Sequence, residues 1–148
     1  MSFRFSLQAV LSCRESFERR ERQRLQVITR EVVRAKQQRD QAVLDRANSL
    51  SQLQMKLRQG MSAVEMQFDL ACDRARVRRI SAWNDQVVKL EGLRCRQLEA
   101  FHNAQQQRKT IENLRDRQLV AYRLAQVRRT QQQMDERFLI TRTAQQVP

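Results

Sequence analysis

The chain has 148 residues, with 29 Lys or Arg against 16 Asp or Glu, and its formal net charge is +13 at pH 7. Hydrophobic residues make up 41 % and aromatic residues 5 %, so large side chains are too few to fill a thick globular core. No apolar run approaches the roughly 20 residues of a membrane span, and no secretory signal opens the chain. We therefore expect a soluble protein of the cytosol.

Proline and glycine are almost absent: proline occurs only at Pro148, and glycine only at Gly60 and Gly92. Because proline costs roughly 3 kcal/mol and glycine about 1 kcal/mol inside a helix, helix is expected nearly throughout. The one clear interruption combines Gly60, which can take the left-handed conformation after a helix, with Ser62 and Glu65, which form a capping-box pattern. The prediction is a monomeric, all-α, long antiparallel two-stranded coiled-coil hairpin, forming a single domain over residues 1–148.

The first helix is expected at about residues 4–58, followed by a hinge at about residues 59–62. Long exposed helices of this composition typically bury one narrow apolar seam against a partner helix. The seam is predicted to change phase after Ala35. Its expected members are Leu25, Ile28, Val32, Ala35, Val43, Ala47, Leu50, Leu57, Met61, Val64 and Phe68.

The return segment is longer than the first helix, since an unbroken helix over 62–140 measures roughly 120 Å against roughly 80 Å. Either it overhangs the first helix, or a short tip helix at about 62–80 precedes a return helix at about 82–140. The second option is favoured, because Ser81 can cap a helix that begins there. The expected seam comprises Ile80, Trp83, Val87, Leu90, Phe101, Ala104, Ile111, Tyr122 and Ala125, interrupted by Arg94, Gln97, Arg108, Arg115 and Gln118.

The sequence offers little for catalysis. It has one histidine, His102, and no glycine-rich phosphate loop, whereas an active site needs several groups that converge in a sheltered pocket. Cys95 and His102 lie two helical turns apart, too few and too distant as ligands for zinc. The other cysteines, Cys13 and Cys72, are expected to be reduced. We predict a protein that is not an enzyme and has no cofactor or metal.

The excess of arginine has three interpretations: a solvated face, a surface for an acidic protein, or a surface for nucleic acid. The few aromatic residues fall at seam spacing and provide no stacking platform for bases. No segment concentrates charge ahead of a clean heptad run, as basic-region zippers do. No specific nucleic-acid complex is therefore expected, and a basic coiled coil that binds nucleic acid or a scaffold is kept as an alternative.

Both ends of the chain carry distinctive motifs. Residues 3–11 (FRFSLQAVL) are followed by Arg14 and Glu15, and residues 114–118 (LRDRQ) are followed by Ala121, Ala125 and residues 133–136 (QMDE). With these two motifs the chain resembles the FliJ family of bacterial flagellar export proteins over essentially its whole length. The hinge near residue 60 and the lack of internal proline agree with the resemblance.

The resemblance implies a soluble, stalk-like component of the flagellar type III export apparatus, similar to the stalk subunits of rotary ATPases. Such a protein binds the hexameric export ATPase FliI, promotes its ring assembly, links it to the membrane export gate protein FlhA, and can bind export chaperones. It lies in the cytoplasm, peripherally associated with the inner membrane at the flagellar base. The equivalent stalk of a virulence type III secretion system is the alternative within this class.

The resemblance implies one set of site residues, for the gate, and the two terminal motifs together with the antiparallel pairing predict a second set, for the ATPase. The ATPase is expected at the end that holds both termini, where the first residues are expected to lie opposite the last part of the return helix. The gate is expected just beyond the hinge, on one helical face; the alternative for Phe68 and Trp83 is ordinary seam packing. The ATPase set is Phe3, Phe5, Leu7, Val10, Leu11, Asp135, Glu136 and Phe138, and the gate set is Phe68, Cys72, Arg76, Arg79 and Trp83.

Overall fold

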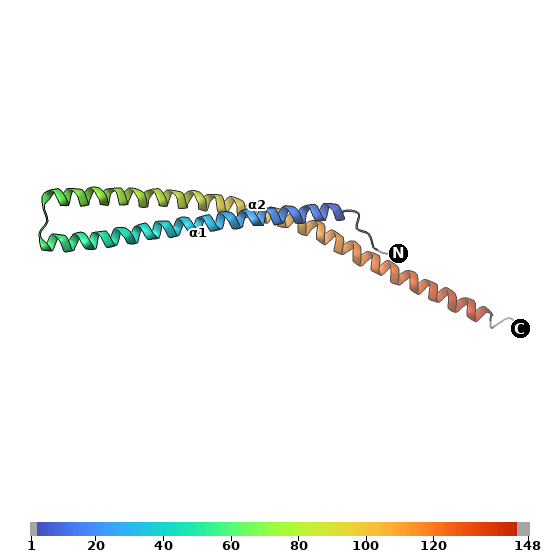
Figure 1. The fold of residues 1–148 in the computed structure, drawn as a ribbon. Coiled ribbons are helices and arrows are strands. Elements are labelled where there is room, and N and C mark those ends of the chain that lie inside the picture. The colour runs from blue at the N-terminus through green and yellow to red at the C-terminus, as the bar shows by residue number, and fades with distance from the viewer. Residues whose placement is uncertain (1–2, 145–148) are drawn as a thin grey trace. The chain divides into compact units, whose positions relative to one another are not determined.

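The computed structural model describes residues 3–144, and side chains as far as residue 142. It contains two long helices, α1 (Gln8–Gln59) and α2 (Ala63–Ala144), and no strand within those residues (Figure 1). The prediction of an all-α helical hairpin is confirmed. The helices pack in two compact units: unit 1 comprises Met1–Glu18 with Asn103–Pro148, and unit 2 comprises Arg19–His102. The single domain expected over residues 1–148 stays a prediction, and each unit is described by itself.

The turn between the helices has the predicted chemistry. Gly60 has a φ of 93°, in the left-handed region that favours glycine. Ser62 donates from its backbone N and its Oγ to Glu65 Oε2, both at 2.9 Å, and the backbone N of Glu65 donates to Ser62 Oγ at 3.3 Å. The hydrogen bond from the Ser62 backbone is the main cause that lowers the pKa of Glu65. The predicted capping box is therefore confirmed.

The predicted break near Ser81 is wrong, because α2 is continuous from Ala63 onward. Ile80 and Trp83 lie half-buried on either side of Ser81, and Val87 is buried one turn further on. These residues keep the same helical spacing through the position where the break was expected. A continuous helix lets all three face α1, whereas a new N-terminus at Ser81 would leave backbone donors without helical partners.

The seam of unit 2 consists of positions that are buried or half-buried at intervals of three, four or seven residues, as in a coiled coil. Its most buried members are Val32, Ala35, Val87 and Leu90, against which Ile28 and Trp83 pack. On α1 the seam comprises Glu21, Leu25, Ile28, Val32, Ala35, Arg39, Ala42, Arg46, Ser49 and Leu53, and on α2 Asp69, Asp73, Arg76, Ile80, Trp83, Val87, Leu90, Gln97 and Phe101.

The predicted change of seam phase after Ala35 is wrong. Val43 and Leu50 are 46 % and 37 % exposed, whereas Ala42 is only 7 % exposed. The seam therefore keeps its original phase as far as Leu53. The same correction applies to four other expected members that are exposed, namely Ala47, Leu57, Val64 and Phe68, and on the return helix to Ala125.

Polar residues occupy seam positions where they find partners on the other helix. Arg46 Nε and Nη2 donate to the two carboxylate oxygens of Asp73 at 2.8 and 3.1 Å. This hydrogen bond is the main cause that lowers the pKa of Asp73 and raises that of Arg46. Other cross-helix contacts in unit 2 are Lys36–Glu91 at 2.6 Å, Lys56–Asp69 at 3.0 Å, and Gln97 Nε2 donating to the Glu21 carbonyl at 3.2 Å. Together these pairs fix the register of the two helices.

Unit 1 packs the start of α1 and the segment before it against α2. Leu11 is 1 % exposed and Phe5 is 8 % exposed, so both belong to the core. The rings of Phe3 and Tyr122 lie 5.6 Å apart, centroid to centroid. Arg14 Nη1 donates to Gln107 Oε1 at 2.6 Å. These contacts place the beginning of the described chain against α2 no further along than about Tyr122.

The end of α2 extends beyond those contacts. From Arg123 to Arg142 every side chain is exposed except that of Gln126, which is half-buried. At 1.5 Å per residue this segment is about 30 Å long. Of the two arrangements considered for the long return segment, the structure therefore has the overhang.

Candidate partner-binding surfaces

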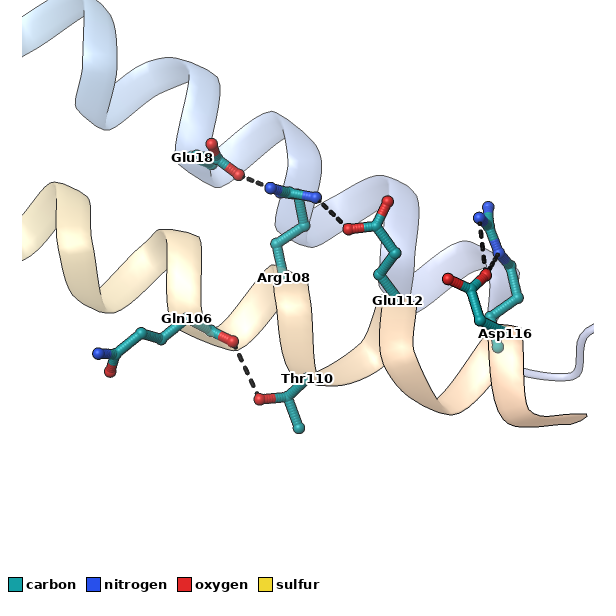
Figure 2. A network of polar contacts seen from close by, with 7 residues as sticks. Glu18, Gln106, Arg108, Thr110, Glu112 and Asp116 are labelled. Carbon is teal, nitrogen blue, oxygen red and sulfur yellow. Dashed lines mark hydrogen bonds and ion pairs between the residues drawn. The ribbon is translucent and has the colours of Figure 1, made fainter.

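A partly buried polar network joins the two helices of unit 1 (Figure 2). Glu18 of α1, only 6 % exposed, accepts a hydrogen bond from Arg108 Nε of α2, and Arg108 Nη1 donates to Glu112 one turn along α2. The pKa of Arg108 is raised, mainly by its hydrogen bond with Glu18. A charged pair in a seam is expensive to desolvate unless it is well hydrogen-bonded, and it favours one register over others. Arg108 therefore helps to fix the register of the two helices and does not interrupt the seam.

The N-terminal members of the predicted ATPase set differ in what they can offer a partner. Phe5 and Leu11 are buried in unit 1, and Phe3 and Leu7 are half-buried. Only Val10 is exposed. Most of these residues therefore build the packed end of unit 1, and a partner would touch Val10 and the edges of the others.

The C-terminal members of the predicted ATPase set lie on the overhanging end of α2. Asp135, Glu136 and Phe138 are all exposed on the overhanging segment, with Asp135 about 20 Å along the helix from Tyr122. The expectation that they lie opposite residues 3–11 is wrong, because Phe3 packs on Tyr122 and α1 begins only at Gln8. The structure does not bring the two halves of the predicted ATPase set together.

The overhang also carries a feature that the sequence reasoning missed. Exposed apolar residues recur from Val120, just before the overhang, to Phe138 at alternating intervals of four and three, with a single glutamine in the series. This spacing puts them on one side of the helix, as in a coiled-coil seam. Period analysis continued past Tyr122 would have found it. We call this series the overhang stripe: Val120, Leu124, Val127, Gln131, Met134 and Phe138.

The predicted gate residues share one face of α2 in unit 2, but they differ in exposure. Phe68 is 68 % exposed, and Arg79 is exposed as well. Cys72 and Arg76 are half-buried at the margin of the seam, and Trp83 packs against the core of unit 2. The structure therefore brings the five residues onto one surface, with Phe68 and Arg79 as its accessible members.

Two hollows lie beside this face. One, of about 570 Å³, is next to the turn and is lined by Gly60, Met61, Val64, Phe68 and Asp69 among others. The other, of about 320 Å³, has Trp83 in its wall together with Ala35, Gln38, Gln86 and Leu90. Apolar side chains that border open hollows are suited to receive side chains of a partner. We call the face with Phe68, Cys72, Arg76, Arg79 and Trp83 the gate face.

Two other features, a membrane-spanning helix and a metal site, are absent from the part of the chain that the structure describes. Within residues 3–144 neither helix contains an apolar stretch long enough to cross a bilayer. No three or more His, Cys, Asp or Glu side chains come together there in a way that could hold a metal ion. The cysteines are free thiols, with Cys13 and Cys95 exposed and Cys72 half-buried.

The fold defines the class of the protein: a two-helix antiparallel hairpin with a coiled-coil seam, in which polar pairs across the seam fix the register. The model of the family described as "Flagellar FliJ protein" matches residues 3–146, nearly the whole chain. The chain therefore belongs to the FliJ family, and it is a component of the flagellar type III export apparatus. The family is one of structural export components and not a family of enzymes. No curated protein and no solved structure shows a significant match to the chain.

Proposed function

We propose that the protein is a stalk-like component that binds the export ATPase FliI through unit 1 and the export gate protein FlhA through unit 2. It acts in the cytoplasm, peripherally associated with the inner membrane at the flagellar base, and export chaperones are further partners. Family membership supports the export role, and the presence of distinct exposed surfaces in the two units supports two partners.

The overhang stripe is the observation that carries the ATPase part of the proposal. Long apolar series at heptad spacing are normally covered by another helix. Here every member of the series after Val120 lies on a part of α2 that extends past the start of α1. Contiguous exposed apolar surface of this kind marks an interaction site. A partner that surrounds the end of α2 would bury Leu124, Val127, Met134 and Phe138.

Charge and dimensions support a ring as that partner. The overhang carries two carboxylates, Asp135 and Glu136, against a larger set of arginines, so its net charge is positive. A helix is about 10 Å wide and a helix pair about 20 Å, which fits the central opening of a hexameric ring. A positive surface complements an acidic lining and speeds encounter with it. The arginines are Arg123, Arg128, Arg129, Arg137 and Arg142.

The ATPase proposal is tested by measuring ATP hydrolysis by purified FliI with the full chain added. The double variant Met134→Ser with Phe138→Ser should lower stimulation about tenfold, because two apolar anchors are lost. Its circular dichroism should match wild type, since both side chains are exposed in the free protein. Val88→Ser, an equally exposed apolar position in unit 2, is the matched control and should stimulate fully. Full stimulation by the double variant contradicts the proposal.

The gate proposal rests on Phe68 and Arg79, which are accessible without unfolding of the seam. Interface anchors of these types commonly contribute 2 kcal/mol or more to binding. Phe68→Ala, and Arg76→Ala together with Arg79→Ala, should each weaken FlhA binding while the melting temperature changes little. Trp83→Ala should weaken FlhA binding and also lower the free energy of unfolding by about 3 kcal/mol, because its ring packs on the core. Unaltered FlhA binding by the first two variants means that the gate site lies elsewhere.

A further inference from the structure

The two flanks of the seam in unit 2 have different chemistry. The ion pair between Lys36 and Glu91, 2.6 Å from Nζ to Oε1, crosses the seam along one flank. Val43 lies one heptad after Lys36 on α1, and Val77 lies two heptads before Glu91 on α2. Heptad spacing returns a side chain to the same side of a coiled coil. Val43 and Val77 therefore lie on the flank that the ion pair marks.

The pairing of Arg46 with Asp73 sets the levels of the residues along that flank. Val43 lies three residues before Arg46 on α1, and Val77 lies four residues after Asp73 on α2. Because the helices are antiparallel, both valines lie on the same side of the Arg46–Asp73 pair and at about the same height along the helix axes. Leu50 and Leu70 lie at the next level by the same argument. The four side chains are 46 %, 42 %, 37 % and 40 % exposed, for Val43, Val77, Leu50 and Leu70 respectively. We call these four residues the aliphatic strip.

The opposite flank at the same levels is polar. The heptad positions there are Gln38, Asp45 and Gln52 on α1, and Cys72, Arg79 and Gln86 on α2. This is the flank of the gate face, so the aliphatic strip is a separate surface. A hairpin that only needed to be soluble would have polar residues on both flanks.

The residues that border the aliphatic strip indicate the charge of a partner that would cover it. On the α2 side the next positions outward are Arg74 and Arg78, both exposed, and neither pairs with a carboxylate among residues 3–142. On the α1 side the strip widens through Leu44 and Ala47, both exposed. The strip is thus apolar with one cationic edge. Unpaired arginine at the rim of an apolar surface favours carboxylates on the partner.

We propose that the aliphatic strip docks one amphipathic helix of a partner protein, whose apolar face packs on Val43, Leu50, Leu70 and Val77 and whose edge toward α2 is acidic. A third helix laid along a two-helix seam buries flank positions of both helices, which the strip supplies in pairs. A second copy of this chain fits less well, because its net charge of +13 opposes association.

The probe is a synthetic amphipathic helical peptide with leucine on one face and glutamate along its edges, labelled for fluorescence anisotropy and added to the full chain. A peptide of the same sequence with lysine in place of glutamate is the charge control. The glutamate peptide should bind saturably, and the lysine peptide about tenfold more weakly or not at all. Added salt should weaken binding of the glutamate peptide, because the charged edge is exposed.

Variants locate the binding. Val43→Ser with Val77→Ser should weaken binding of the glutamate peptide about tenfold. Arg74→Glu should weaken it too, and this exposed site presents no risk to folding. Leu93→Ser, an exposed apolar position on the opposite flank, and Phe138→Ser, on the overhang stripe, are matched controls that should bind like wild type.

Three results would overturn the proposal. One is the absence of saturable binding by the glutamate peptide. Another is binding that survives both Val43→Ser with Val77→Ser and Arg74→Glu but is lost in Phe138→Ser, which assigns the peptide to the overhang. The last is a wild-type dimer in sedimentation velocity that Val43→Ser with Val77→Ser converts to monomer, which assigns the strip to a second copy of the chain.

Discussion

Glu18 of α1 and Arg108 of α2 form an ion pair across unit 1, although they are 90 residues apart in the sequence. Glu18 is buried, and Arg108 also reaches Glu112. The pair occupies positions where a coiled coil normally carries apolar residues. Similar contacts recur in unit 2, where Arg46 meets Asp73. Matched polar pairs therefore help to set the register in both units, beside the apolar packing.

Removal of Glu18 should destabilise the protein. Glu18→Ala leaves Arg108 half-buried with Glu112 as its remaining carboxylate partner among residues 3–142, and the loss of a charged hydrogen bond of this kind costs about 1–3 kcal/mol. Thermal denaturation followed by circular dichroism measures the loss. Glu15→Ala, at an exposed position on the same helix, is the matched control and should melt like wild type. Equal melting temperatures for the two variants would refute the structural role of the pair.

The phase of the seam is tested by two neighbouring substitutions. Ala42→Asp should place a carboxylate in a seam position that is only 7 % exposed and cost about 3 kcal/mol, because the charge is desolvated there and Arg46, one turn along, is already paired with Asp73. Val43→Asp puts the same group on the exposed flank and should cost less than about 1 kcal/mol. Urea unfolding of both variants decides the order. A larger loss for Val43→Asp would restore the change of phase that the structure rejects.

Acid should weaken unit 2 through Asp73. Its pKa is lowered from 3.8, mainly by the hydrogen bond with Arg46. A carboxyl group whose pKa is lower in the folded state stabilises the fold above its unfolded pKa, and this contribution is lost as pH falls through the folded pKa. The melting temperature of wild type should therefore drop more steeply than that of Asp73→Asn as the pH falls below about 4. Parallel curves for the two proteins would show that the Arg46 pair adds nothing to pH dependence.

The capping box should make a measurable contribution at the start of α2. Ser62→Ala removes the hydroxyl that the Glu65 backbone donor reaches, and such losses cost typically about 1 kcal/mol. Ser51→Ala, an exposed serine inside α1, removes a hydroxyl without a cap and is the comparison. Differential scanning calorimetry should rank Ser62→Ala as the less stable. The opposite ranking would show that the turn does not depend on its cap.

The turn and the first part of the seam were predictable because each follows from local chemistry. Gly60, Ser62 and Glu65 specify the reversal with only a few residues. Val32 and Ala35 are apolar residues at regular spacing, and they are buried as expected. Helix caps and apolar periods depend on neighbours in the sequence, so one chain is enough to detect them.

The later seam and the overhang were not predictable in the same way. At Arg46 and Arg108 the seam continues with charged residues, and only the fold reveals that Asp73 and Glu18 lie opposite them. A search for apolar residues at helical spacing rejects such positions. It therefore assigns Val43 to the seam, although Val43 lies on the exposed flank. The overhang was not predicted for the same reason. The position on α2 that Phe3 reaches, at Tyr122, depends on the register of the two helices, and polar pairs help to set that register.

The central claim, that one chain binds FliI through the overhang and FlhA through the gate face, is tested most directly by titration calorimetry of two variants against both partners. Met134→Ser with Phe138→Ser should lose FliI affinity about tenfold or more and bind FlhA like wild type. Phe68→Ser with Arg79→Glu should show the reverse pattern. All four side chains are exposed, so both variants should melt near wild type. Variants that melt normally but lose both partners together, or neither, would contradict the account.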